Sequence, residues 1–294
     1  MRILLTIPHF FNPVGNGRYG STQPDPKPRL AALTQALRNL YTLYAGAQEY
    51  WYREGDRLHP HAANQAAPVT MDIVICTCRD LHLLDQLVLP PDLYTHQRID
   101  CEPLQLGFEC HTVLRERLGD YDLYGYMEDD LILHDPNFFH KLCYFTQRVG
   151  VDHVLQPNRF ERYGSMSAFK KVYIDFAFDS PEAFAARNPM PIVLEQLGWE
   201  TEFCIADNAH AGAFFLTQAQ MAHWTKQAYF GDRAATYVGP LESAATLGLL
   251  RTFKVYKPAP RNANFLEIEH YGQIWSRQLA AVRFGKAPST IRQK

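Results

Sequence analysis

The first 135 residues alternate short apolar runs with longer segments of helical periodicity, and this alternation limits the fold more than any other feature. The runs at 2–8 (RILLTIP) and 69–78 (VTMDIVICTC) have the length and composition of buried strands. Residues 29–51 carry apolar side chains at helical spacing, with prolines before them and none inside. Because strands that alternate with helices build parallel sheets, we predict an α/β fold class: a single Rossmann-like domain whose mainly parallel sheet is flanked by helices.

Further along the chain, the pattern predicts a loop at 53–68 and a strand at 122–128 (DLYGYME). It also predicts a Ser-capped helix at 180–188, because Ser180 and Pro181 precede an apolar run. The other expected elements are strands at 96–103, 170–179 and 210–217, and helices at 106–119, 217–228 and 239–252.

Three consecutive acids, Glu128, Asp129 and Asp130, follow the strand at 122–128. Parallel sheets bind ligands beyond the carboxyl ends of their strands, which is where these acids lie. If the strand continues through them, Glu128 and Asp130 face one side and Asp129 faces the other. Two such carboxylates suit Mg²⁺ or Mn²⁺, which prefer oxygen ligands. A solvated, acidic strand end is the alternative.

The overall charge balance points to no nucleic-acid partner, since 29 basic and 31 acidic residues leave a net charge of −2. The apolar start is broken by Pro8 and is too short for a signal peptide, and no apolar run is long enough to span a bilayer. Six scattered cysteines without a CxxC pair fit a reducing compartment, so we expect a cytoplasmic protein. The basic residues of 276–294 predict either a disordered end or contact with anionic lipid at the inner face of a membrane.

Residues 15–20 (GNGRYG) match the glycine pattern of a dinucleotide-binding loop. The expected strand, however, ends near Pro8, and several prolines delay the next helix. The glycines therefore do not join a strand tightly to a helix, and we expect no dinucleotide site here. A flexible loop near a nucleotide or acceptor remains the alternative.

Several segments resemble GT-A glycosyltransferases, in the family's order. YDLYGYMEDDLILHDP resembles the DxD strand, with EDD in place of DxD, and RILLTIPHFFN is similar to the opening strand. HAGAFFLT resembles the glycine-containing segment near the donor sugar, and GPLESAA resembles the xED segment, although Ser243 follows Glu242 where a second acid is usual. IEHYG places His270 where many members carry a metal-binding histidine.

The resemblance covers residues 1–275. It implies a GT-A-like domain with a nucleotide-sugar-binding half at 1–135 and an acceptor and catalytic half at 136–275, followed by a basic tail at 276–294. It also implies the catalytic roles. Asp130 and His270 would ligate Mn²⁺ or Mg²⁺, with Glu128 on the ribose or a metal-bound water, and Glu242 would take the proton from the acceptor hydroxyl.

Further residues are expected at the site, most of them because they follow predicted strands and Gly212 because of the resemblance. Arg159 and Arg162 are expected on the acceptor side or at a phosphate. The residues expected to bind the nucleotide or donor sugar are Pro8, His9, Phe10, Thr77, Arg79, Asp80, Asp129 and Gly212.

The resemblance therefore implies a metal-dependent enzyme that moves a sugar from a nucleotide-sugar, with a UDP-sugar as first expectation, to a glycan or lipid-linked hydroxyl. Inversion by direct displacement is favoured because Glu242 offers a base. Such a reaction would serve polysaccharide or lipopolysaccharide assembly. Two alternatives fit the same features: a nucleotidyltransferase, which would release pyrophosphate, and a non-catalytic carbohydrate-binding protein on the same fold.

Overall fold

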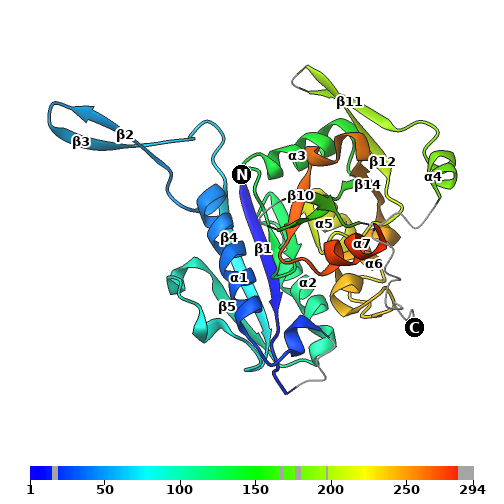
Figure 1. Cartoon of the computed structure of the whole chain (residues 1–294), viewed down its shortest axis with the longest axis horizontal. Coiled ribbons are helices and arrows are strands. Elements are labelled where there is room, and N and C mark those ends of the chain that lie inside the picture. Colours follow the sequence, from blue (N-terminus) through cyan, green and yellow to red (C-terminus); the bar gives the residue numbers. More distant parts are fainter. Residues whose placement is uncertain (15–18, 166–167, 176–179, 197, 284–294) are drawn as a thin grey trace.

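The computed structural model describes residues 1–14, 19–165, 168–175, 180–196 and 198–283. Its central sheet has the strand order β13-β6-β1-β4-β5, and Figure 1 labels β1, β4 and β5 of it. The four strands β6, β1, β4 and β5 run parallel, and β13 is antiparallel to β6 at one edge. The prediction of a mainly parallel sheet is thus confirmed. The strands are β1 (Arg2–His9), β4 (Thr70–Cys78), β5 (Thr95–Ile99), β6 (Leu123–Met127) and β13 (Ala213–Thr217).

Helices cover both faces of this sheet. Side chains of β1 alternate between the faces: Ile3, Leu5 and Ile7 pack in one core with α1 and α3, whereas Leu4 packs in a second core with α2, α5 and α6. Apolar residues on both faces explain why these strands read as continuous apolar runs. The helices are α1 (Lys27–Leu40), α2 (Leu106–Glu116), α3 (Phe138–Val149), α5 (Gln218–Thr225) and α6 (Pro240–Thr252).

A second sheet, with the order β10-β9-β15-β7, lies beyond the carboxyl end of β6. Strand β7 begins at Leu131, immediately after the three acids, and pairs with β15, which in turn runs parallel to β9. The acids therefore connect the central sheet to the second sheet. The strands are β7 (Leu131–Ile132), β9 (Asn158–Ser165), β10 (Ala168–Tyr173) and β15 (Glu267–His270).

A third sheet, with the order β11-β12-β14-β8, carries the remaining strands of the second half. Helix α4 (Pro181–Arg187) precedes β11, and the Ser180 hydroxyl accepts a hydrogen bond from the Ala183 N–H at 3.2 Å, so the predicted cap is confirmed. The strands are β8 (His153–Leu155), β11 (Ile192–Gln196), β12 (Trp199–Ile205) and β14 (Lys254–Pro258).

Two predictions fail between α1 and β4. Helix α1 ends at Leu40 and one π-helical turn follows at Tyr41–Ala45, so the helix does not reach residue 51. The expected loop at 53–68 instead contains much of an exposed hairpin, β2 (Glu49–Glu54) and β3 (Arg57–Ala62), which projects from the body (Figure 1). Cross-strand ring contacts stabilise it, among them Tyr52 with His61 at 4.4 Å between ring centroids.

The C-terminal part contains helix α7 (Ile274–Arg283), which spans the expected boundary between residues 275 and 276. The rest of the basic tail, 284–294, lies outside the described residues, as do 15–18 of the glycine-rich loop and 176–179 of the strand expected at 170–179. Within the described part of the chain, no helix is both long and apolar enough to cross a membrane.

Candidate functional site

The three acids form a tight turn, here called the acid turn (Glu128–Asp130), at the carboxyl end of β6. The Glu128 N–H donates to the Gly212 carbonyl at 2.9 Å, and the Leu131 N–H donates back to the Glu128 carbonyl at 3.2 Å. The Tyr271 N–H donates to the Asp130 carbonyl at 2.8 Å. Backbone bonds therefore fix the turn between the segment that enters β13 and the end of β15.

Gly212 has to be a glycine. Its φ of +63° lies in the left-handed region, which side chains with a Cβ rarely adopt. A Cβ at this position would lie 2.9 Å from Cδ1 of Leu131 and 3.2 Å from Oε2 of Glu128. The position predicted near the donor sugar thus lets the backbone approach the acid turn closely.

Asp129 is 1% exposed and points toward β1 and α1. The Leu83 N–H donates to His9 Nε2 at 3.1 Å, so in neutral His9 the proton is on Nδ1, which lies 2.6 Å from Asp129 Oδ2. The Arg29 guanidinium bonds Asp129 and also donates to Asp130 Oδ2 at 3.1 Å. Burial raises the pKa of Asp129, but Arg29 and His9 outweigh this effect and hold the pKa below its ordinary value. Asp129 therefore anchors the turn.

Glu128 and Asp130 each keep one side-chain oxygen without a partner in the described part of the chain. Glu128 Oε1 and Asp130 Oδ1 are buried and accept no hydrogen bond from any residue that the structure describes. Burial, together with Asp130 and Glu242, raises the pKa of Glu128 well above its ordinary value, and Arg159 lowers it. Buried carboxylate oxygens without partners are costly unless a proton or a cation satisfies them.

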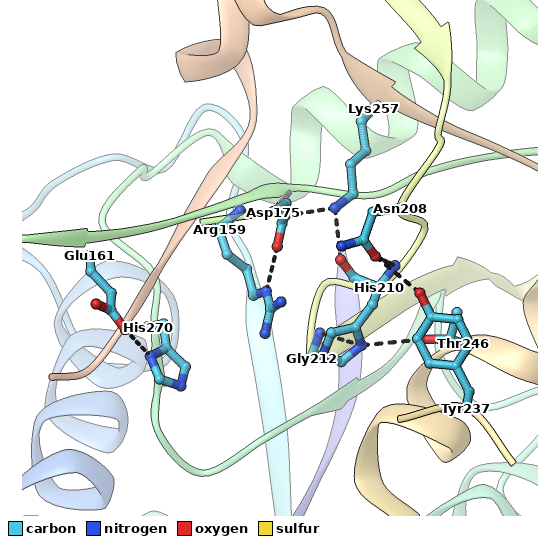
Figure 2. Close-up of polar contacts among 10 residues, drawn as sticks. All are labelled: Arg159, Glu161, Asp175, Asn208, His210, Gly212, Tyr237, Thr246, Lys257 and His270. Carbon is cyan, nitrogen blue, oxygen red and sulfur yellow. Dashed lines mark hydrogen bonds and ion pairs between the residues drawn. The ribbon is translucent and has the colours of Figure 1, made fainter. Parts of the chain in front are cut away.

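His270, at the end of β15, faces the acid turn. Its Nε2 lies 3.8 Å from Asp130 Oδ2, and its Nδ1 lies 2.9 Å from Oε1 of Glu161 in β9 (Figure 2). Burial raises the pKa of Glu161, but hydrogen bonds from His270 and Ser276 hold it at about 2. Glu161 is therefore an acceptor at neutral pH, and His270 Nδ1 donates to it.

Arg159, also on β9, is held by a buried ion pair. Its Nε donates to Asp175 Oδ1 at 2.7 Å, and Asp175 Oδ2 accepts from Lys257 Nζ at 2.6 Å. Burial raises the pKa of Asp175, but Lys257 and Arg159 lower it to about 2. Figure 2 shows the Arg159 side chain between His270 and His210, with its guanidinium pointing away from its own strand. Because Nε is fixed by Asp175, the terminal nitrogens form a positioned cation.

Glu242 lies in the first turn of α6 and is half-buried. Burial raises its pKa and nearby Asp130 adds to this, whereas its own backbone N–H and Arg159 lower it. The predicted base thus shares one electrostatic environment with Asp130 and Arg159, although 112 positions separate it from Asp130 in the sequence.

The other predicted residues lie elsewhere or make different contacts. Pro8 and Phe10 flank His9 at the end of β1, and buried Thr77 donates to the Arg79 carbonyl at 3.2 Å. The side chains of Arg79, Asp80 and Arg162 are directed to partners outside the acid turn. Arg79 pairs with Asp100 at 2.6 Å and Asp80 pairs with Arg98 at 2.9 Å. Arg162 pairs with Glu269 at 2.6 Å.

Four charged side chains of the site were not predicted: Arg29, Glu161, Asp175 and Lys257. Arg159 and Glu161 are two apart on one strand, so they face the same side, and this alternation in NRFERYG was a usable signal. Arg29 lies in the first turn of a helix, where many arginines are exposed, so its position in the sequence gave no signal. Asp175 and Lys257 are far apart in the sequence, and only the fold brings them together.

The site suits a hard divalent cation in part. Among the described residues, no three His, Cys, Asp or Glu side chains form a ready-made metal-binding group. Glu128 Oε1 and Asp130 Oδ1 are nevertheless oxygen donors of the kind that Mg²⁺ and Mn²⁺ take, and these ions keep positions for water and phosphate.

No protein-family model and no curated protein sequence matches this chain.

Proposed function

We propose that this protein is a metal-dependent glycosyltransferase that moves a sugar from a nucleotide-sugar to a hydroxyl acceptor. One observation carries the proposal: at the carboxyl edge of a parallel sheet, Glu128 and Asp130 each present a buried oxygen that no described residue bonds. A ligand is expected at this edge, and these oxygens demand a cation or a proton.

The diphosphate of the donor would lie at the acid turn. A bound Mg²⁺ or Mn²⁺ would neutralise the charge that develops on the departing diphosphate. Glu128 and Asp130 would hold this cation, with His270 at its side. Arg159 would add a fixed positive charge, since Asp175 holds its Nε and leaves the terminal nitrogens to bind phosphate oxygens.

Glu242 would act as the base. Burial raises the pKa of its half-buried carboxyl group above the ordinary value, which strengthens it as a proton acceptor for a hydroxyl. It lies near Arg159 and Asp130, so an acceptor hydroxyl beside Glu242 would be close to a sugar whose diphosphate occupies the acid turn. This arrangement favours a direct displacement with inversion.

The donor, the acceptor and the location in the proposal rest on the resemblance to GT-A glycosyltransferases and on the basic C-terminal segment. The donor is proposed to be a UDP-sugar, and the acceptor a glycan or lipid-linked hydroxyl in polysaccharide or lipopolysaccharide assembly. We place the reaction in the cytoplasm, at the inner face of the membrane if the basic segment 276–294 contacts anionic lipid.

A thermal-shift experiment tests the proposal. The wild type, Asp130→Asn and the control Asp56→Asn, whose exposed carboxylate lies in the β2–β3 turn, are each heated with UDP, GDP, CMP or TDP. Each nucleotide is tested with Mn²⁺ and with EDTA. A nucleotide at 100 times its Kd adds about 2.7 kcal/mol to the free energy of unfolding.

We expect one nucleotide to raise the Tm only with Mn²⁺, for the wild type and Asp56→Asn but not for Asp130→Asn. Absence of any shift would contradict the proposal and favour a carbohydrate-binding protein. With the matching nucleotide-sugar and an acceptor, release of a nucleoside diphosphate supports glycosyl transfer, whereas release of pyrophosphate would indicate a nucleotidyltransferase.

A further inference from the structure

We propose that Glu161 is a positioning residue that orients His270 toward the acid turn and couples this orientation to the docking of helix α7. The inference rests on the proposed function, because it concerns how the protein builds the cation site at the acid turn. Neither the sequence pattern nor the resemblance assigned a role to Glu161.

Glu161 is fully buried, and its carboxylate is shared between two elements. Oε1 accepts from His270 Nδ1 at 2.9 Å and from the Trp275 N–H at 3.3 Å. Oε2 accepts from the Ser276 N–H at 2.7 Å and from the Ser276 hydroxyl at 2.6 Å. Four hydrogen bonds therefore converge on one carboxylate.

The hydrogen bond between Glu161 and His270 determines that Nε2, and not Nδ1, is the ring nitrogen nearer the acid turn. With Nδ1–H donated to Glu161, a neutral His270 carries its lone pair on Nε2, 3.8 Å from Asp130 Oδ2. Two electron-rich atoms then face each other, an arrangement that a cation between them would stabilise. A carboxylate behind the imidazole also fixes the ring and makes Nε2 a stronger ligand.

The bonds to Trp275 and Ser276 bring helix α7 into this arrangement. The first N–H groups of a helix have no acceptor within the helix, and Glu161 satisfies two of them from β9. Its negative charge also suits the positive end of the helix dipole. When α7 is docked, Glu161 is fixed for His270, so displacement of α7 would loosen the imidazole.

The test measures Mn²⁺ affinity without turnover, from the electron paramagnetic resonance signal of free Mn²⁺ during titration. Glu161→Gln keeps the size of the side chain but replaces one acceptor oxygen with an NH₂ group, which only donates. The single remaining oxygen cannot accept from both His270 and Ser276. Ser276→Ala removes one of the four hydrogen bonds and leaves His270 untouched. The control Glu267→Gln alters another carboxylate near the site, one that bonds Tyr173 at 2.6 Å.

We expect Glu161→Gln to weaken Mn²⁺ binding by about 10- to 100-fold, as loss of an outer partner of a metal ligand does. Ser276→Ala should weaken it less, and Glu267→Gln should not. Adding Glu161→Gln to His270→Ala should cause no further loss, because Glu161 acts through His270.

Each outcome decides a separate point. If the wild type binds no Mn²⁺, the proposed cation site is wrong and this inference falls with it. If the wild type binds Mn²⁺ and Glu161→Gln binds it equally well at a lower Tm, Glu161 only stabilises the fold. If Glu161→Gln does not fold, Ser276→Ala decides, and unchanged Mn²⁺ affinity in that variant overturns the inference.

Discussion

His111 is a buried histidine of α2 whose charge state links stability to pH. It is 5% exposed, and its ring centroid lies 5.0 Å from that of Trp224 and 5.5 Å from that of Phe214. Burial lowers its pKa from 6.5 to about 3. Between these values the unfolded chain binds a proton that the folded protein excludes, so the free energy of unfolding falls as the pH falls, by up to ~1.4 kcal/mol per pH unit.

Replacing His111 with Phe should remove this dependence. We expect urea unfolding of His111→Phe to lose less stability than the wild type between pH 6.5 and 4.5, by about 2 to 3 kcal/mol over the interval. The control His59→Phe changes a histidine on the exposed hairpin and should follow the wild type. Parallel curves for the wild type and His111→Phe would show that His111 is protonated in the folded state.

At the same scale, the sequence predicted only in part which of the three acids contact the protein and which remain open to a ligand. Strand alternation separates Asp129 from its neighbours, and the structure turns it toward His9 and Arg29. Strand β6, however, ends at Met127, so the acids form a turn, and Asp130 also bonds Arg29. A periodicity rule cannot report where pairing stops, because pairing depends on Gly212 and Tyr271, far along the chain.

At the scale of elements, the buried strands were predicted well because burial on both faces leaves a strong local signal, as in β1 and β4. The hairpin β2–β3 was missed because its strands are exposed on nearly every residue and carry no apolar alternation. The contribution of strands β9 and β15 to the site could not be predicted, because the two strands pair with each other across about 100 residues of sequence.

The exposed hairpin should be removable. The Ala63 N–H donates to the Gln48 carbonyl at 2.8 Å, so the chain ends on either side already meet. We expect replacement of residues 49–62 by Asn-Gly, which suits a two-residue hairpin turn, to change the free energy of unfolding by no more than about 1 kcal/mol.

Chemical denaturation followed by circular dichroism measures this change. Gly125→Ala serves as the positive control, because a Cβ there would lie 2.8 Å from the Phe215 ring and 2.9 Å from Leu5 in the central sheet. A loss on excision as large as that of Gly125→Ala would show that the hairpin stabilises the core.

At the scale of the whole molecule, the acid turn joins the central sheet to the second sheet and gathers charges from distant elements. The net charge of −2 hides this local concentration. Arg29 of α1 is the cation that bonds two of the three acids directly. Burial lowers the pKa of Arg29, but Asp129, Asp130 and Glu128 outweigh this effect and raise the pKa above its ordinary value. Arg29 thus compensates two negative charges at the connection between the two sheets.

Arg29→Met should therefore destabilise the whole fold. Removing one partner of a buried ion pair leaves the other charge uncompensated, which costs about 3 to 5 kcal/mol. The control Arg38→Met changes an exposed arginine of the same helix and should cost little. Urea unfolding at pH 7 measures both losses, and equal losses would contradict a special role for Arg29. Because a divalent cation can supply the missing positive charge, Mn²⁺ should stabilise Arg29→Met more than it stabilises the wild type.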